Sequence, residues 1–280
     1  MVRRRRWAAA VLSALVLVAA VVVVHRAGGG SHVAPTPRPA GGATVGGGST
    51  AAAEPKGTTA AKVVVRLGAI AHAVPGRARV VSAGPSGRRL VALTFDDGFC
   101  AGCVRDLVRA VERTGAHVTF CPNGIYARSW EAQRRAIRRM LATGQVAMCN
   151  HTFSHADLRQ VDAARLRDEI DRNERWIERT FGVTARPYLR PPYGAYNSAV
   201  LTAAGAAGFT RIAMWSGTLA DSSVRTEDYL VAAIKAWAKP GAIILAHGNY
   251  PATPRAFDRI LKVLRQRHLH TATLPELLAG

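Results

Sequence analysis

From position 90 to the C-terminus, apolar runs of about five residues alternate with amphipathic stretches of ten or more residues. Residues 90–95 have the length and the apolar content of a buried strand. Residues 104–115 then place apolar side chains at helical spacing and end on a glycine. Regular repetition of such pairs is typical of βα units around a parallel sheet or barrel.

This alternation predicts about seven strands and six helices. The predicted strands are residues 90–95, 117–121, 145–149, a short strand ending near Arg190, residues 209–215, residues 242–246 and a last strand near His270. The predicted helices are residues 104–115, 130–143, 163–181, 197–207 with Asn197 as cap, 226–238 and 254–267. Seven strands fall short of a closed eight-stranded barrel, so we expect a distorted, incomplete (β/α) barrel, with a doubly wound open sheet as the alternative.

The first sixty residues have a different character. Arginines at positions 3–6 precede an uncharged apolar run over residues 7–24, which is about as long as a membrane-spanning helix. The positive-inside rule would place the rest of the chain outside the membrane. We therefore expect a single-pass signal anchor in residues 1–26, with secretion after signal cleavage as the alternative. Residues 27–59, rich in Gly, Ala and Pro, predict a disordered linker; residues 60–89 lead into a catalytic domain at 90–280.

Size and charge narrow the function classes. The 280 residues are 49% hydrophobic, enough for one sizeable core in a domain that we expect to be monomeric. The formal net charge of +20 would suit nucleic acid, but the arginines are scattered over predicted helix faces and no nucleic-acid motif accompanies them. We therefore expect no nucleic-acid partner.

Four cysteines lie in the part predicted to be exported: Cys100, Cys103, Cys121 and Cys149. Export favours disulfides, and three complete pairings are possible. A redox pair or half of a zinc site would also use a CxxC spacing, but a second CxxC is absent. Structural bridging is the favoured interpretation, with the pairing left open.

Two motifs at predicted strand ends offer metal ligands. Asp96 and Asp97 precede a glycine, and because neighbouring strand residues face opposite ways, we expect them to have different partners. His151 and His155, at i and i+4, would lie on one face of a helical turn and bind one cation. Each motif alone is common as a turn or by chance. Together, Asp97 and the two histidines form a His₂–carboxylate set that leaves coordination positions for water and substrate.

Four ordered motifs now identify a family. TFDDG at 94–98, HTFSH at 151–155, RPPYG at 190–194 and LAH at 245–247 closely resemble the polysaccharide deacetylases of carbohydrate esterase family 4, the NodB homology domain. The resemblance covers about residues 90–280. It implies an incomplete barrel of the NodB type and a metal-dependent hydrolase that removes acetyl groups from polysaccharide.

The resemblance also implies a role for each matching residue. Asp96 would be the general base, and Asp97, His151 and His155 would hold a divalent metal, with Zn²⁺ the expected ion. Arg190 would pair with the base and keep it ionised and oriented, as a guanidinium beside a carboxylate does.

The remaining roles lie on the leaving-group side. The main-chain N–H of Tyr193 would bind the oxyanion, Leu245 would line the acetyl pocket, and His247 would protonate the departing amine or alkoxide. These parts meet the needs of amide hydrolysis, which requires an activated water, a stabilised oxyanion and a proton donor.

One motif departs from the family pattern, which is similar to WSVDTLDW. Here Thr218 replaces the first acid and Ser222 the final tryptophan, while Asp221 is retained and would tune His247. A plain loop cap is the alternative role for Asp221. We expect a deacetylase of N-acetylated cell-surface glycan, peptidoglycan or chitin-like. The alternatives are an O-acetyl xylan esterase and a tethered glycan-binding module with weak turnover.

Overall fold

The computed structural model describes residues 75–279. The predicted anchor, the linker and the first part of the lead-in therefore lie outside the described residues. Among residues 75–279, no helix has both the length and the apolar character needed to cross a bilayer.

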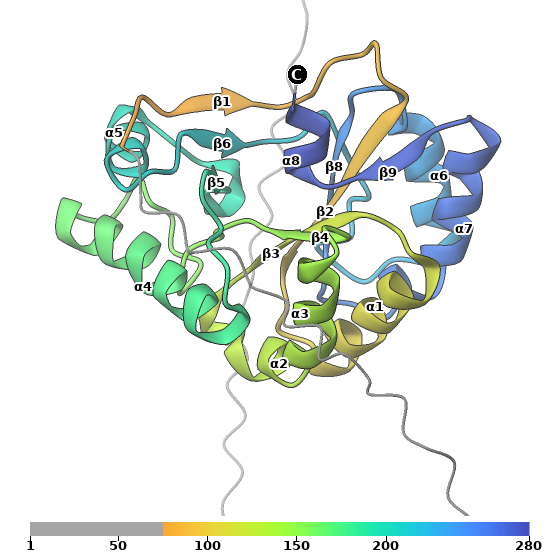
Figure 1. Ribbon diagram of the computed structural model, residues 1–280, viewed down its shortest axis with the longest axis horizontal. Helices are drawn as coiled ribbons and strands as arrows, with labels where there is room; N and C mark the ends of the chain where they lie inside the picture. The colour runs from red at the N-terminus through yellow and green to blue at the C-terminus, as the bar shows by residue number, and fades with distance from the viewer. Residues whose placement is uncertain (1–74, 280) are drawn as a thin grey trace, which may run out of the picture. The chain divides into compact units, whose positions relative to one another are not determined.

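A parallel sheet forms the centre of the described domain (Figure 1). Its strands run in the order β4, β3, β2, β8, β7, and β9 also pairs with the start of β2. Every ladder in this sheet is parallel, as the strand–helix alternation predicts. The strands are β2 Leu90–Asp97, β3 Val118–Pro122, β4 Val146–Met148, β7 Gly217–Thr218, β8 Ile243–His247 and β9 His270–Ala272.

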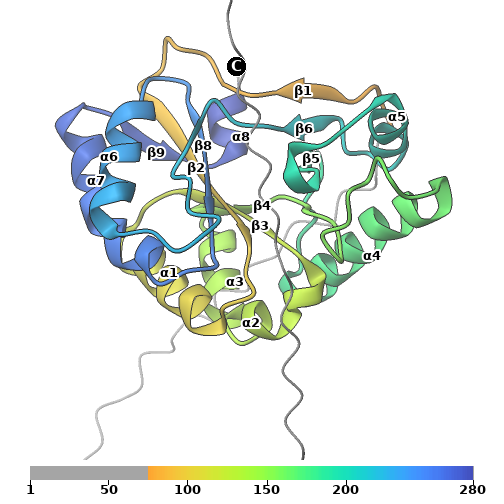
Figure 2. The same ribbon diagram turned by 180° about the vertical axis from the view of Figure 1, so that it is seen from behind.

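A second, three-stranded parallel sheet has the order β1, β6, β5 (Figure 2). It comprises β1 Arg79–Val81, β5 Tyr188–Leu189 and β6 Arg211–Ala213. A single parallel bridge between Asn150 and Leu189 joins the segment after β4 to β5. No ladder among the described strands closes the ring between the two sheets. The arrangement is the expected distorted, incomplete (β/α) barrel.

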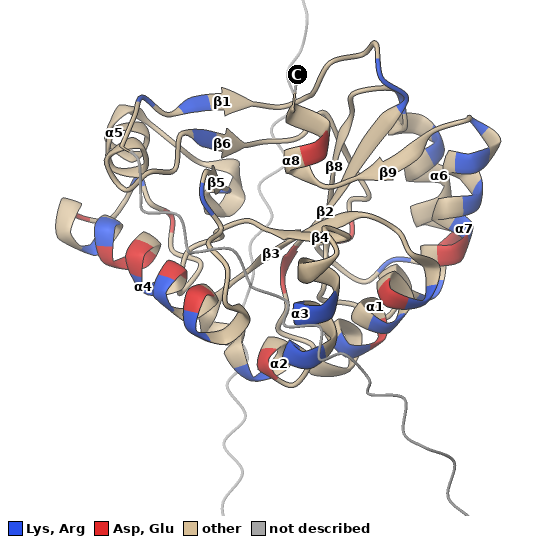
Figure 3. Cartoon of the chain, in the orientation of Figure 1, with Lys and Arg blue, Asp and Glu red and all other residues tan. Residues whose placement is uncertain are grey.

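Helices surround the strands on the outside (Figures 1 and 2). They are α1 Ala101–Thr114, α2 Ala127–Glu131, α3 Arg134–Ala142, α4 Ala163–Phe181, α5 Ser198–Ala206, α6 Glu227–Trp237, α7 Ala252–Gln266 and α8 Leu274–Leu278, with short 3₁₀ turns at Gly124–Tyr126 and Pro192–Gly194. Helix α7 packs against both α1 and α6, and α4 packs against α3 and α5. Charged residues lie mostly on these outer helices, whereas the central strands carry few (Figure 3). This distribution agrees with the scattered arginines of the sequence.

Side-chain alternation along β2 divides the core into two layers. Phe95, with Val91 and Leu93, packs toward the helices, where its ring lies 6.2 Å from Phe120 and 6.1 Å from Phe257. Burying one such ring contributes about 1.5–3 kcal/mol. The alternate residues, which include Thr94 and Asp96, face the barrel interior. The same alternation that builds the core thus places Asp96 inside the barrel.

The structure changes the prediction at several elements. The predicted helix 130–143 is two helices, α2 and α3, separated by a turn. Near the end of α2 the buried Trp130 donates its indole N–H to the carbonyl of Asp97, which ties this helix to the loop after β2. Strands β1 and β7 and helix α8 were not predicted, since each has five residues or fewer and shows no full period.

Candidate metal and catalytic site

The predicted site residues meet at the carboxyl edge of the barrel strands. Because the strands are parallel, the segments after β4 and β5 and the ends of β2 and β8 come to one side. Asp96 on β2 lies in register beside His247 on β8. A cavity of about 510 Å³ opens there. Its lining includes Asp96, Asp97, His151, His155, Tyr193, Leu245 and His247.

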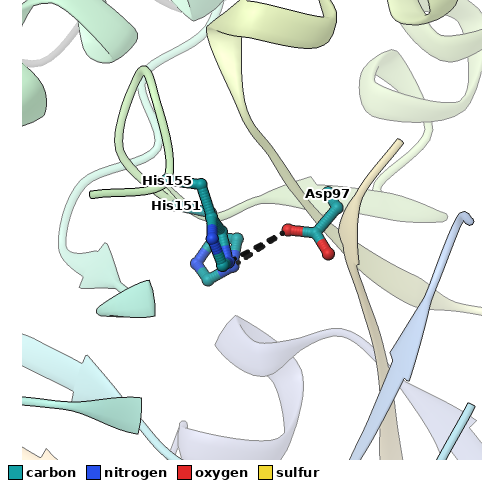
Figure 4. Close-up of side chains that lie close together, drawn as sticks. All are labelled: Asp97, His151 and His155. Carbon is teal, nitrogen blue, oxygen red and sulfur yellow. Dashed lines mark ion pairs between the residues drawn. The ribbon is translucent and has the colours of Figure 1, made fainter. Parts of the chain in front are cut away.

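Asp97, His151 and His155 form a three-ligand cluster (Figure 4). Oδ1 of Asp97 lies 3.3 Å from Nε2 of His151 and 3.4 Å from Nε2 of His155. That oxygen is buried, and within the described chain no donor meets hydrogen-bond geometry with it. Nδ1 of His151 lies 2.7 Å from the carbonyl oxygen of Arg190, which fixes Nδ1 as the protonated nitrogen of a neutral ring and turns Nε2 inward. A buried oxygen lacking a donor beside two imidazole nitrogens fits a divalent cation.

The electrostatics of the three groups also suit a cation. Burial alone would raise the pKa of Asp97, but the interaction with His151 and the charges of both histidines hold it well below its ordinary value. Burial and the neighbouring His151 lower the pKa of His155, which favours the neutral, ligating ring. His151 differs. Burial lowers the pKa of His151, but the charges of Asp96 and Asp97 outweigh burial and raise it overall. A cation must therefore displace a proton from His151, so acidic pH should weaken cation binding.

Asn249 orients the carboxylate of Asp97 and was missed by sequence reasoning. Its Nδ2 donates to Oδ2 of Asp97 at 2.8 Å, and its Oδ1 accepts from the N–H groups of Gly98 and Phe99 at 3.0 and 3.3 Å. The backbone of Asp97 is left-handed, with φ of 67°, and the hydrogen bonds that Asn249 accepts from the two following residues help to hold this strained conformation. Asn249 lies only two residues after His247, but a lone asparagine there has no distinctive pattern.

The expected helical turn across His151 and His155 is wrong. Residues 151–155 form a loop in which Thr152 and His155 have φ of 66° and 61°. The buried Glu169 on α4 holds this loop by accepting from both the N–H and the hydroxyl of Ser154. The two rings still lie close together, because the left-handed residues Thr152 and His155 bend the chain between positions 151 and 155.

Asp96 has the partner predicted for it. Nη1 of Arg190 donates to Oδ1 of Asp96 at 2.8 Å and to the hydroxyl of Thr94 at 2.7 Å, while its Nε donates to the carbonyl of Ala213. Burial works against the charged guanidinium, but the Asp96 charge outweighs burial and raises the pKa of Arg190. The pair occupies the barrel interior, whereas Asp97 points to the histidines, so the two acids do have different partners.

His247 is paired with Asp221, which is not a simple loop cap. Nδ1 of His247 lies 2.9 Å from Oδ1 of Asp221, and Oδ2 accepts from the N–H of His247 at 3.0 Å and from the hydroxyl of Thr253 at 2.6 Å. Burial lowers the pKa of His247, but the hydrogen bond to Asp221 and its charge raise it overall. Thr253 on α7 is another contributor that no sequence motif indicated.

Other predicted residues lie at the rim. Tyr193, with φ of 60°, is 70% exposed, and its ring packs against that of His155 in a T-shaped arrangement with 4.6 Å between centroids. Leu245 lines the cavity and is almost fully buried. The substituted positions Thr218 and Ser222 line the same cavity, so the departure from the family motif lies within the site.

The cysteines divide into two pairs. Cys100 and Cys103 form a disulfide at the start of α1, so one bridge among the possible pairings is present. Cys121 and Cys149 are buried free thiols on the neighbouring strands β3 and β4 or directly after them. Neither pair ligates the candidate metal site.

Comparison with known proteins agrees with the geometry. The family model described as polysaccharide deacetylase matches residues 83–212, which contain Asp96, Asp97, both histidines and Arg190. A chitooligosaccharide deacetylase of a Bradyrhizobium species is 31% identical over 69% of this chain and 92% of its own length. The chain belongs to the polysaccharide deacetylase family.

Two further relatives support the assignment of the fold and family. A peptidoglycan-N-acetylglucosamine deacetylase of Bacillus cereus is 28% identical over 69% of this chain and 70% of its own length. A solved peptidoglycan N-acetylglucosamine deacetylase, in complex with 4-naphthalen-1-yl-N-oxidanyl-benzamide, superposes with a TM-score of 0.65 at 26% identity. That comparison covers 72% of this chain and 93% of the other. This polysaccharide deacetylase is thus a hydrolase of carbohydrate esterase family 4.

Proposed function

We propose that this deacetylase removes acetyl groups from N-acetylated glycan, peptidoglycan or a chitin-like polymer, with a divalent metal, Zn²⁺ by preference, at Asp97, His151 and His155. The observation that carries the proposal is the convergence of this cluster with the Asp96–Arg190 and Asp221–His247 pairs on one cavity. Two imidazoles and one carboxylate are a ligand set suited to zinc with open coordination.

The base side of the reaction belongs to Asp96. Arg190 holds Oδ1 at 2.8 Å, so Oδ2 remains to accept a proton from the attacking water. Oδ2 lies 3.6 Å from Nε2 of His151, which places it at the edge of the ligand cluster. The bound metal would supply Lewis-acid polarisation of the acetyl carbonyl and a lower pKa for water.

The acid side belongs to His247. Because the pKa of His247 is raised, its ring stays protonated up to a higher pH than an ordinary histidine. The hydrogen bond to Asp221 occupies Nδ1, so Nε2 would donate the proton to the leaving nitrogen. The main-chain N–H of Tyr193 would stabilise the oxyanion, and Leu245 would contact the acetyl methyl group. Retention of both the base and the acid favours an enzyme over a binding module.

The substrate class is inferred from the relatives' names, which include chitooligosaccharide and peptidoglycan deacetylases. The exposed ring of Phe99 at the cavity rim packs against Tyr126 and Tyr250, and apolar rings of this kind can contact sugar faces. Display outside a membrane, close to such polymers, rests on the sequence of residues 1–26 alone.

Acetate release tests the proposal. The purified full chain should release acetate from N-acetylated chitooligosaccharide or peptidoglycan, lose that activity with chelator and regain it with Zn²⁺. Asp96→Asn should lower kcat by about 10²–10⁴-fold, the usual contribution of general base catalysis, while Zn²⁺ still binds. Asp258→Asn, which alters an exposed ion pair with Arg113, is the matched control and should keep full activity.

Three results would refute parts of this proposal. Activity insensitive to chelation would reject the metal, and full activity of Asp96→Asn would reject the base. Acetate release from acetylated xylan alone would make the protein an O-acetyl esterase.

A further inference from the structure

The Cys100–Cys103 disulfide lies between the metal loop and α1. Cys100 follows Asp97 by three residues and is the N-cap of the 14-residue helix α1, where its sulfur accepts from the N–H of Cys103. Cys100 is half-buried, Cys103 is buried, and the intervening Ala101 and Gly102 are exposed. A Cβ added at Gly102 would meet only the tip of the Arg105 side chain. Of the two cysteines, Cys100 is therefore the one nearer to solvent.

The helix start favours a charged sulfur at this position. The N-terminus of α1 carries partial positive charge, and its first turn contains no acidic residue. A thiolate at a helix N-terminus within a CxxC spacing is stabilised, and stabilising the reduced form makes the disulfide easier to reduce. The position and partial exposure of Cys100 are thus those of an exchanging sulfur rather than of a sealed bridge.

The disulfide also restrains the short loop that carries the metal ligand Asp97. Asp97 has a left-handed backbone, which a non-glycine residue keeps only when its surroundings enforce it. Three restraints act on residues 97–100: the bond from Trp130 to the Asp97 carbonyl, the contacts of Asn249, and the disulfide at the far end. Opening the disulfide removes the covalent restraint at position 100.

We propose that Cys100–Cys103 is a thiol–disulfide exchange site whose oxidation state sets the cation affinity of Asp97, His151 and His155; the second half rests on the proposed metal site. The reductant is a dithiol. Its thiolate attacks the Cys100 sulfur and forms a mixed disulfide, and Cys103 leaves as a thiolate. The second thiol of the reductant then displaces Cys100. The reductant is oxidised by two electrons to its disulfide, and its two protons pass to Cys100 and Cys103.

The other two cysteines provide an internal control. Cys121 and Cys149 are fully buried, so they should resist both exchange and alkylation while the chain stays folded. Selective labelling of Cys100 and Cys103 therefore cannot be attributed to unfolding.

The experiment places the full chain in a graded series of reduced and oxidised dithiothreitol without denaturant, followed by alkylation and peptide mass spectrometry. We expect Cys100 and Cys103 to take up label together and reversibly, while Cys121 and Cys149 do not. Labelling that needs denaturant would show a sealed structural bridge and overturn the exchange site. This measurement requires neither deacetylation nor a metal, so it is independent of the proposed function.

Zn²⁺ titration of the reduced chain, after Cys100 and Cys103 are capped with iodoacetamide so that their thiols cannot bind Zn²⁺ themselves, tests the coupling. We expect about a tenfold weaker Kd than for the oxidised chain, which corresponds to about 1.4 kcal/mol. The Cys100→Ser, Cys103→Ser double variant should show the weak Kd in both conditions. Equal Kd values for the oxidised and reduced wild type would overturn the coupling. Absence of Zn²⁺ binding in either state would instead contradict the metal site itself.

Discussion

Replacing Asn249 by alanine tests whether the metal site depends on support behind its ligands. Asn249 donates to Oδ2 of Asp97 at 2.8 Å and accepts from two backbone N–H groups, and only 5% of the residue is exposed. Loss of the hydrogen bond that orients a metal ligand typically weakens metal affinity about 10- to 100-fold, or about 1.4–2.8 kcal/mol. Without Asn249, rotation of the Asp97 carboxylate is unrestrained on that side.

The same substitution should also lower the free energy of unfolding. The N–H groups of Gly98 and Phe99 lose their acceptor, and a buried donor left unsatisfied costs about 1–3 kcal/mol. Because Phe99 is exposed, water can replace part of the loss, and we expect about 2 kcal/mol in all. Urea unfolding measures this loss, and calorimetric titration with Zn²⁺ measures the affinity.

Asn197→Ala is the matched control for Asn249→Ala. Asn197 also accepts from a backbone N–H, that of Val200, but it caps α5 and does not line the cavity. Its loss should cost about 1 kcal/mol of stability and leave Zn²⁺ affinity unchanged. A folded Asn249→Ala variant that binds Zn²⁺ within twofold of the wild type would refute the role assigned to Asn249.

Two further substitutions test other parts of the site. Asp221→Asn removes the charge that raises the pKa of His247, so the loss of kcat/KM at alkaline pH should begin at lower pH than in the wild type; an unmoved pH profile would contradict His247 as the acid. Gly98→Ala should destabilise the fold by more than 2 kcal/mol, measured by urea unfolding, since its Cβ would lie 2.1 Å from the Trp130 indole nitrogen. Gly115→Ala, also at positive φ but in open space, should cost only about 1 kcal/mol.

Much of the fold could be predicted because the main elements are long enough to show a period. Helix α4 has the predicted bounds, 163–181, since its apolar stripe, its cap at Asp162 and its terminal Gly182 agree. The short elements β1 and β7 could not be predicted in this way. Two or three residues carry no period, and their strand geometry comes from partners on β6 and β8 that are distant in the chain.

The site shows the same division between local pattern and tertiary context. The ligand types and their order along the chain predicted the cluster of Asp97, His151 and His155, but local spacing gave the wrong conformation between the histidines. A helical i, i+4 pair and a left-handed loop can bring the same two rings together. Contacts from elsewhere in the chain hold the loop: Glu169 on α4 accepts from Ser154, and Asn123 donates to the carbonyls of His151 and Thr152.

The residues that sequence reasoning missed share one physical property: they act on a ligand or an acid rather than on substrate. Thr253 donates a hydrogen bond to Oδ2 of Asp221, and Asn249 donates one to Oδ2 of Asp97. In each carboxylate Oδ2 thereby accepts from a neutral donor, while Oδ1 faces His247 in Asp221 and the two histidine ligands in Asp97. Neutral donors are necessary here, because a lysine or arginine at either position would compete with the metal or with His247 for the negative charge. The choice of uncharged side chains at 249 and 253 is therefore as much a part of the site as the ligands themselves.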